Sequence, residues 1–414
     1  MRTRGGTRRL CIVFCGMLQF LATNPSRAAE WSMEPSVDLR TEYNDNINFT
    51  SAPHPSVWGV ILSPDIKFSG TTEALNVTGG LRFNFNRYFG EQGLDTNDHI
   101  LSLRSTYKGE RDVLGLNIDS VEDSTLVSEL SDTGVVLARD QRRRLTANPS
   151  WSRYLTETTA ITASYSYNDV NYANNVETGL IDYRDQTAIV GLTYRPGERD
   201  LVSLTGYYDR YETNPARALA NTYGIQVGYD RAFSETLHGS LALGSRNTRS
   251  TFTNQALVCD GFILAGICFG NVTTVTLVTK ANSTGYIFAA NLDKQWETAR
   301  LSAALSRSIN PSGAGTLVET DHLGVTWTQH WSPTVSSSLG AGLYQSRYGG
   351  NVTASDSRYY TIEPRVSWRL TERWTLSGGY SYRHAKYESS GASASGNVAY
   401  LVLSYAWPKL SWSR

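Results

Sequence analysis

Large apolar residues alternate with small or polar residues along most of this chain, which is the period of a β-strand and not of a helix. The odd-numbered positions are apolar in Leu323–Trp327 and in Tyr223–Tyr229, and the even-numbered positions are apolar in Trp374–Tyr382. A strand that crosses a bilayer needs about 9–11 tilted residues for the hydrocarbon alone. The alternating arms reach that length, so the pattern predicts membrane-crossing strands.

One arm–turn–arm unit occurs twice and aligns without a gap. Pro149–Tyr167 reads PSWSRYLTETTAITASYSY, and Pro364–Tyr382 reads PRVSWRLTERWTLSGGYSY. The two segments share Leu-Thr-Glu at the centre and Tyr-Ser-Tyr at the end. We predict that Leu-Thr-Glu is a tight turn between two long antiparallel strands.

Eight such turn signals recur along the chain and divide it into sixteen arms. They lie at Gly70–Thr72, Gly109–Arg111, Leu155–Glu157, Pro196–Glu198, Ser234–Thr236, Trp296–Thr298, Ser332–Thr334 and Leu370–Glu372. Two flanking arms, Val37–Phe49 and Val398–Trp407, bring the count to 18, an even number as in bacterial single-chain barrels. We therefore predict an all-β fold, a transmembrane antiparallel up-and-down β-barrel of about 18 strands, with 16 strands as the alternative.

The other ends of the arms are joined by longer segments rich in Gly, Asn, Asp and Ser, which suit exposed loops. With the chain start in the periplasm these loops face outward, and they include residues 51–56, 88–98, 125–139, 174–182, 253–282, 349–356 and 388–396. Two alternative folds fit less well. A propeller repeats at a similar length but uses four short strands per blade, and a soluble sandwich offers no partner sheet for arms this long.

The N-terminus has the features of a secretory signal peptide. Four Arg precede a short apolar core at Leu10–Leu21, and Ser26-Arg27-Ala28 is a small-x-small cleavage site. We predict a signal peptide over residues 1–28 and one barrel domain over residues 29–414, in the outer membrane of a Gram-negative bacterium. Removal of the signal peptide takes five Arg and no acidic residue, so the formal charge falls from zero to −5. This balance does not favour a nucleic-acid partner.

Two cysteines, Cys259 and Cys268, remain in the predicted mature chain. Two cysteines nine positions apart in an exported protein predict a disulfide. A metal pair would need further ligands nearby, and no His lies between them. The sequence offers no metal site, no cofactor site and no catalytic constellation, so we expect a protein that is not an enzyme.

The most informative polar residues are Arg on the face opposite the apolar positions. Lipid-facing Arg at mid-bilayer costs about 2–4 kcal/mol, so these side chains are expected to point into the lumen. The predicted lumen-lining residues are Arg82, Arg104, Arg144, Arg246, Arg365, Arg383 and Glu363. One interpretation is that these Arg pair with acids and brace a wet lumen. The other is that they guide an anionic solute, because the planar guanidinium binds carboxylates in a bidentate way.

The hairpin at Leu370–Tyr382 and the opening Pro35–Asn46 resemble outer-membrane β-barrel proteins found with exopolysaccharide and exosortase-type loci. The resemblance implies a conduit or accessory for secreted polysaccharide, with no catalytic residues to carry over. Its implied partners are outer-membrane lipids and lipopolysaccharide, an anionic polysaccharide and periplasmic export machinery.

Three functions stay open at this point. The first is a polysaccharide-export or general diffusion pore. The second is a structural or surface-interaction barrel with a closed lumen. The third is an outer-membrane barrel enzyme, which the sequence favours least.

Overall fold

The computed structural model describes residues 29–51, 54–135, 138–215, 217–260, 262–264, 267–348, 356–388 and 391–413. For residues 254–257, 262–264 and 267–269 it describes the backbone but not the side chains. The predicted signal peptide and its cleavage site lie outside the described residues.

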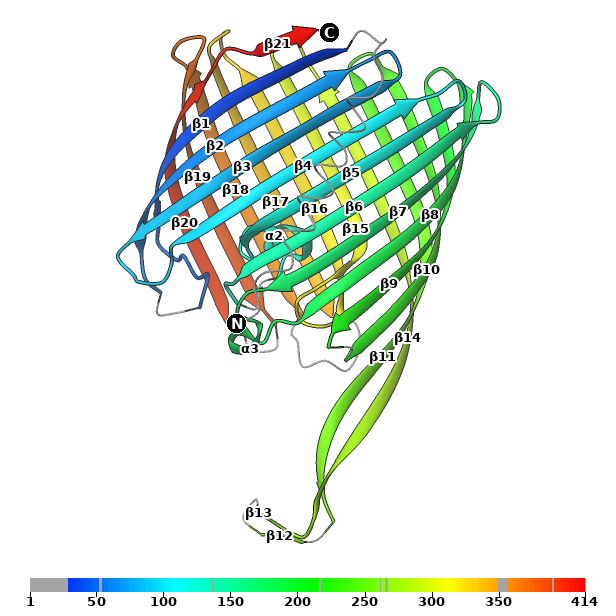
Figure 1. Ribbon diagram of the computed structural model, residues 1–414, viewed down its shortest axis with the longest axis vertical. Helices are drawn as coiled ribbons and strands as arrows, with labels where there is room; N and C mark the ends of the chain where they lie inside the picture. The colour runs from blue at the N-terminus through cyan, green and yellow to red at the C-terminus, as the bar shows by residue number, and fades with distance from the viewer. Residues whose placement is uncertain are drawn as a thin grey trace.

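The described chain forms one large antiparallel sheet that closes into a barrel of 18 long strands (Figure 1). These are β1 (Glu30–Asn44), β2 (Val57–Thr71), β3 (Leu75–Phe89), β4 (Thr96–Lys108), β5 (Asp112–Ser124), β6 (Gln141–Tyr154), β7 (Thr159–Tyr172), β8 (Asp182–Gly197), β9 (Asp200–Asn214), β10 (Ala218–Ser234), β11 (Leu237–Cys259), β14 (Val272–Gln295), β15 (Ala299–Pro311), β16 (Leu317–His330), β17 (Val335–Tyr348), β18 (Ser357–Arg369), β19 (Trp374–Tyr387) and β20 (Ser393–Ala406). Each strand pairs with its neighbours in sequence, and β1 pairs with β20 to close the barrel. The predicted fold class and strand number are confirmed.

Five shorter elements complete the described structure. They are α2 (Ser128–Thr133), α3 (Asn175–Thr178), the strand pair β12 (Phe262–Leu264) and β13 (Ile267–Phe269), and the C-terminal β21 (Leu410–Ser413). β21 pairs with the first residues of β1, beyond the end of β20. Neither helix in the described ranges is long and apolar enough to cross a membrane.

All eight predicted short turns are confirmed, and they lie at one end of the barrel, the upper end in Figure 1. The repeated unit explains two of them. The Leu155 and Leu370 amides donate to the carbonyl oxygens of Thr159 and Trp374, both at 2.9 Å. The Thr of each Leu-Thr-Glu accepts from the backbone amide three residues later, at 3.0 and 3.1 Å. Short turns mark the periplasmic end of outer-membrane barrels, so we call the short-turn end the periplasmic end and the long-loop end the outer end.

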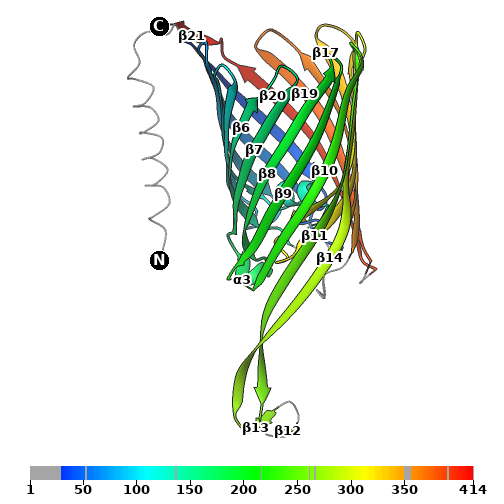
Figure 2. The ribbon, with the colours of Figure 1, turned by 90° about the vertical axis from the view of Figure 1, so that its right-hand side faces the viewer.

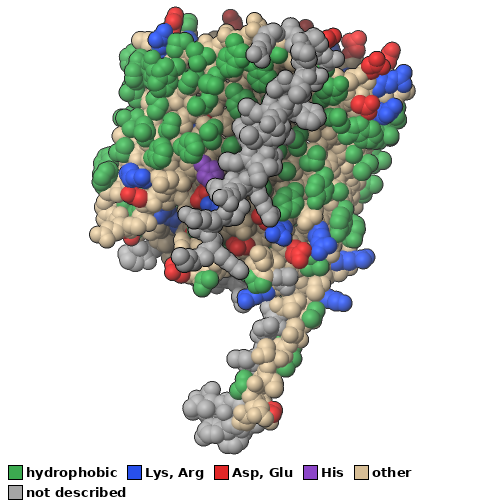
Figure 3. Space-filling view, viewed as in Figure 1, with side chains coloured by type: hydrophobic (Ala, Val, Ile, Leu, Met, Phe, Trp, Pro, Cys, Tyr) green, Lys and Arg blue, Asp and Glu red, His purple; other side chains and the backbone are tan. Residues whose placement is uncertain are grey.

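The outer wall of the barrel carries an apolar belt (Figure 3). Its members occupy alternate strand positions and keep a third to two thirds of their surface exposed, as Phe83, Leu243, Val366 and Leu401 show. Side chains this apolar remain exposed in a stable protein only where lipid covers them. The belt therefore marks the membrane-spanning part of the wall.

Two predicted boundaries were wrong. The first strand is Glu30–Asn44 and not Val37–Phe49, because Ile47 and Phe49 turn into the barrel and are buried there. The predicted loop of residues 253–282 is mostly strand, since β11 and β14 stay paired from Leu237↔Lys294 to Cys259↔Val272. The run Val272–Thr279 is rich in Val and Thr, which favour a pleated strand. The result is a long hairpin that projects beyond the outer end of the barrel (Figure 2).

Candidate channel lumen and its outer closure

The lumen is open and polar toward the periplasmic end. A cavity of about 440 Å³ lies against β1–β4, and Glu34, Asp65, Lys67, Arg82 and Arg104 supply its charged groups. These residues alternate with the lipid-facing ones, so the barrel places them on its inner surface. Three cationic and two acidic side chains make this part of the lining net positive.

The outer half of the lumen is packed instead of open. Along the inner face of β18, Ser357 and Tyr359 near the outer end are 1% and 6% exposed, whereas Glu363 and Arg365 further down are exposed. Ser346 on β17 and Thr320 on β16 are also buried near their outer ends. Other parts of the chain therefore fill the barrel lumen at its outer mouth.

One filling element is the β5–β6 connection, described over residues 125–135 and 138–140, which contains α2. Figure 1 shows α2 within the outline of the barrel. Its far end meets the opposite wall, where Ser346 and Thr320 donate to the carbonyl oxygen of Thr133. β6 and β16 are eight strands apart in a barrel of 18, so this loop crosses almost the full width of the lumen.

Glu129 on α2 is the main polar anchor of this crossing. Its carboxylate accepts hydrogen bonds from the Gly313 amide at 2.9 Å and from the Tyr172 hydroxyl at 3.1 Å. Gly313 lies in the β15–β16 connection and Tyr172 at the end of β7, so one side chain joins three parts of the barrel. Glu129 is only 3% exposed. Burial raises the pKa of its carboxyl above the ordinary range, and the nearby Arg142 guanidinium opposes that rise.

Asp132, also on α2, ties the loop back to its own wall. Its Oδ2 accepts from Arg142 at 3.0 Å and from Arg144 at 3.1 Å. Its carbonyl oxygen accepts from Asn310 of β15 at 3.2 Å. The helix ends at Gly134, whose φ of 70° suits glycine, and a Cβ at this position would lie 2.5 Å from the Cβ of Tyr344.

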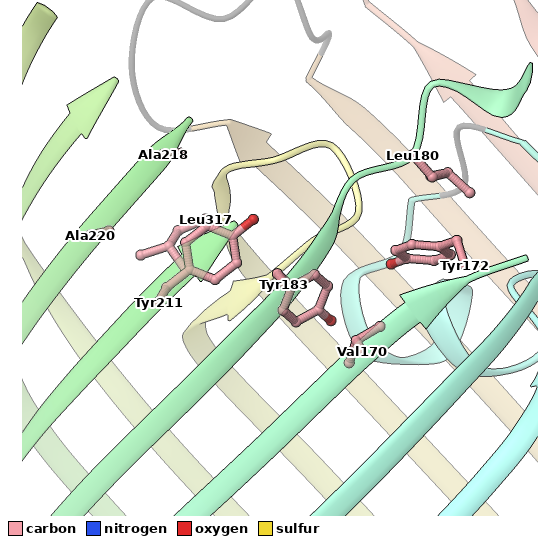
Figure 4. Close-up of a cluster of buried hydrophobic side chains, with 8 residues drawn as sticks. All are labelled: Val170, Tyr172, Leu180, Tyr183, Tyr211, Ala218, Ala220 and Leu317. Atoms are coloured by element: carbon pink, nitrogen blue, oxygen red, sulfur yellow. The ribbon is translucent and has the colours of Figure 1, made fainter. Parts of the chain in front are cut away.

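The β15–β16 connection forms a second inward-folded segment. Its Ser312 and Gly313 carbonyl oxygens accept from the Tyr211 hydroxyl at 3.1 Å and from the Ile181 amide at 2.8 Å. Leu317 then packs into a buried cluster with Val170, Tyr172, Leu180, Tyr183, Tyr211, Ala218 and Ala220 (Figure 4). These partners come from β7–β10 and from the β7–β8 connection, so apolar contacts also cross the lumen.

The β1–β2 connection closes the remaining side. Asn46 is fully buried, and its side-chain amide donates to the carbonyl oxygens of Thr50 and Ser395, both at 2.8 Å. Phe49 meets Tyr359 edge-on at 6.2 Å between ring centroids, and the Arg383 guanidinium lies 5.5 Å from the Phe49 ring. Together the described parts of the three inward-folded connections fill much of the outer mouth, while the periplasmic side stays open.

The predicted lumen-lining residues divide into two groups. Arg104, Arg365 and Glu363 are exposed within the open part. Among the described residues, Arg365 donates to Ser377 at 3.4 Å, and Glu363 accepts from Ser381 at 2.9 Å and from Thr361 at 3.3 Å. Arg365 and Glu363 lie two positions apart on the same face of β18.

The other predicted Arg are engaged with acids or with inward-folded loops. Arg82 pairs with Asp38 at 2.9 Å, Arg144 pairs with Asp132 of α2, and Arg383 lies against Phe49. Arg246 is buried and pairs with Glu319 at 2.5 Å. Arg144 and Arg383 therefore meet inward-folded loops, whereas Arg82 and Arg246 pair with acids on the strands β1 and β16.

Sequence reasoning missed the residues that close the mouth, above all Glu129, Asp132 and Tyr172. The segment of residues 125–139 was expected to be an exposed loop because of its Ser, Asp and Gly residues. A signal that could have found the closure is Leu126 and Leu130, two Leu one helical turn apart, which are buried against Phe49, Tyr359, Ala385 and Ala394.

Cys259 is disulfide-bonded. The side chain of Cys268 lies outside those that the structure describes, so the pairing of these two residues stays a prediction. Within the described ranges, no cluster of three or more His, Cys, Asp or Glu side chains is arranged to hold a metal ion.

No protein-family model and no curated protein matches the sequence. Several solved structures resemble the fold. They include Pseudomonas aeruginosa OpdK with vanillate (11% identity, 92% of this chain and 99% of that chain, TM-score 0.47) and P. aeruginosa OccK2 (OpdF) with glucuronate (11%, 90% and 97%, TM-score 0.46). Acinetobacter baumannii OccAB2 is similar at 10% identity, 91% and 98% coverage and TM-score 0.47. Likenesses this distant do not identify what passes through the present barrel.

Proposed function

We propose that this protein is an outer-membrane channel with a closable outer mouth, which admits small acidic solutes when the α2 loop moves aside. The observation that carries the proposal is the path of residues 125–135. They cross the lumen and are held by polar contacts, chiefly those of Glu129, Asp132 and Thr133, and by the packing of Leu126 and Leu130. A loop held in this way is a movable barrier, because the strands of the wall keep their hydrogen bonds when it leaves.

The preference for acidic solutes rests on the open part of the lumen. Arg104 and Arg365 are exposed there and form no ion pair with any described residue, so their guanidinium groups are free to meet a carboxylate. Lys67 and Arg82 add positive charge to the same cavity. The alternative, that these side chains only brace the wall, applies best to Arg82, which already holds Asp38.

Export of an exopolysaccharide, with an anionic polysaccharide and periplasmic export machinery as partners, stays a hypothesis from the sequence resemblance. A polymer chain needs a mouth that is wide open along its whole length. The packed outer loops therefore favour diffusion of small solutes over a permanent polymer conduit. A barrel with a permanently closed lumen is the remaining rival, because the same loops would then be a fixed plug.

Planar-bilayer recordings of the purified protein, with and without α2, test the proposal. We expect the wild type to show low and intermittent conductance. Removal of Ser128–Thr133 should raise both the conductance and the time spent open, with anions carrying most of the current. The matched control removes α3, Asn175–Thr178, which lies in the β7–β8 connection and has no buried residue.

Two outcomes would contradict the proposal. If the variant without α2 stays as closed as the wild type, the loop is not the barrier and the lumen is plugged. If it opens but prefers cations, the channel stands and the acidic solute class is wrong.

A further inference from the structure

The barrel wall is incompletely paired between β14 and β15. Their backbone register runs only from Phe288↔Arg307 to Gln295↔Arg300, which is eight residue pairs. Beyond this point β14 continues to Val272 paired with β11 alone, and β15 continues to Pro311 paired with β16 alone. The β15–β16 end folds into the lumen as described above, whereas the β11–β14 hairpin projects outward. The two strands therefore diverge and leave a gap in the wall.

Side chains bridge this gap in place of backbone hydrogen bonds. Arg246 of β11 reaches Glu319 of β16 at 2.5 Å, passing over Gly285 of β14. A Cβ at Gly285 would lie 3.1 Å from the Arg246 Nη2 atom, so glycine leaves room for the guanidinium. On the outer side, the Arg307 guanidinium lies 4.4 Å from the Tyr286 ring and binds Asp321 through two nitrogens.

A cavity of about 220 Å³ lies at this gap. Its polar lining includes Arg246, Thr248, Ser283, Glu319, Arg347 and Tyr348. Some of these side chains belong to the inner face of β11 and β14, and others to β16 and β17 across the gap. The volume suits a phosphate or a small carboxylate with a few waters.

The charges around the cavity do not balance. Arg246, Arg307 and Arg347 share two carboxylates, because Arg347 lies 3.4 Å from Glu319 and 3.2 Å from Asp321, both of which already serve another Arg. Within this group of five side chains, three Arg and two carboxylates, one positive charge is in excess. A surplus cation in such a site favours an anion as its counterpart.

Two residues that line the cavity each carry a buried polar atom without a hydrogen-bond partner in the described structure. These atoms are the Nε of Arg246, whose residue is 5% exposed, and the hydroxyl of Tyr348. A buried donor without a partner costs about 1–3 kcal/mol. Both atoms are donors that an anionic oxygen would satisfy.

We propose that the gap between β14 and β15 is an anion-binding site, in which Arg246, Arg347 and Tyr348 hold a phosphate or carboxylate group. The site does not depend on the gating of the outer mouth. Its ligand has two conceivable sources, since the gap begins where the lipid-facing belt ends, just beyond Leu305 and Leu323. One source is the phosphate of an outer-leaflet lipid, and the other is a free anion from the aqueous side.

Two measurements test the site. Barrel refolded in phosphate-free, non-ionic detergent is titrated with inorganic phosphate, and the midpoint of thermal unfolding is followed against sodium chloride at equal ionic strength. Barrel extracted from outer membranes is washed, and its bound lipid phosphorus is measured per chain. We expect phosphate to raise the wild-type midpoint, because a ligand that binds only the native state stabilises it.

The variant R246Q/R347Q should bind phosphate about tenfold to a hundredfold more weakly, as expected for losing hydrogen bonds to a charged group. Arg249→Gln is the matched control, because Arg249 lies on β11 but is exposed and does not line the cavity. If the double variant does not fold, as judged by heat-modifiable migration on gels, R347Q replaces it, since the Arg347 side chain is 37% exposed.

The results distinguish three outcomes: a bound lipid phosphate, a bound free anion, or no anion at the site. Bound lipid phosphorus that is lost in R246Q/R347Q assigns the site to a lipid phosphate. A phosphate-dependent shift without such lipid assigns it to a free anion. If phosphate leaves the midpoint unchanged and the lipid content of the double variant equals that of the wild type, the cavity holds only water and the proposal is overturned.

Discussion

Replacing Glu129 with alanine is expected to release the α2 loop from the opposite side of the lumen. The carboxylate accepts from the Gly313 amide and the Tyr172 hydroxyl, and both donors are buried in the closed state. Losing a hydrogen bond to a charged acceptor costs about 1.5–3 kcal/mol. The buried carboxylate also carries a desolvation cost of a few kcal/mol, which alanine removes. The net loss for the closed state is about 1–3 kcal/mol.

This loss changes the ratio of closed to open channels by about 5-fold to 150-fold, since 1.4 kcal/mol corresponds to a factor of ten. Single-channel recording in planar bilayers measures the ratio directly as open probability. Glu129→Gln should have a smaller effect, because its amide oxygen still accepts from Gly313. Glu177→Ala is the control, since Glu177 lies in α3, which has no buried residue.

One result would refute this reasoning. If folded E129A protein has the open probability of the wild type within a factor of two, the contacts of Glu129 do not hold the mouth closed. The barrier would then rest on the apolar cluster around Leu317, or the closure would be permanent.

Three further predictions can be measured on the same protein. Raising the pH should favour opening, because burial raises the pKa of Glu129 in the closed state. The Glu129 carboxyl is therefore more protonated in the closed state than in the open state, and deprotonation at higher pH favours the open state. E129Q should flatten the pH dependence of the open probability. Charge reversal at Arg104 or Arg365 should lower the preference for anions in bilayer recordings, whereas Arg358→Glu, on the lipid-facing side of β18, should leave it unchanged. Mass spectrometry of protein from the native envelope should find Cys259 and Cys268 joined, with about 2–3 kcal/mol of stabilisation confined to the hairpin; two free thiols would contradict this.

The wall of the barrel could be predicted because its determinants are local. Alternation of period two fixes which side chains meet lipid, and turn residues fix where each strand reverses. The Leu-Thr-Glu turns illustrate this, since the Thr of each turn caps the amide three residues later. These signals lie within a few residues of the structure that they determine.

The closure of the mouth could not be predicted because its partners are far apart in sequence. Glu129 and Gly313 are separated by 184 positions, and no period relates them. The partners of the predicted lumen-lining Arg could not be predicted for the same reason, because alternation gives the direction of Arg144, Arg246 and Arg383 but not the distant side chains that meet them. The extension of the β11–β14 hairpin was predicted as a loop. Its Asn, Gly and Thr residues were given more weight in that prediction than the Val-rich run of β14.

The β11–β14 hairpin continues for seven residues of β11 past its last pairing with β10 at Phe252, a reach of about 20 Å. If the long loops face away from the cell, antibodies and bacteriophages would meet this ribbon before the mouth. Beyond Thr253 its described backbone pairs only within the hairpin, so substitutions there are expected to leave the barrel and its mouth unchanged. For the same reason, an epitope grafted there would report surface display without disturbing permeation.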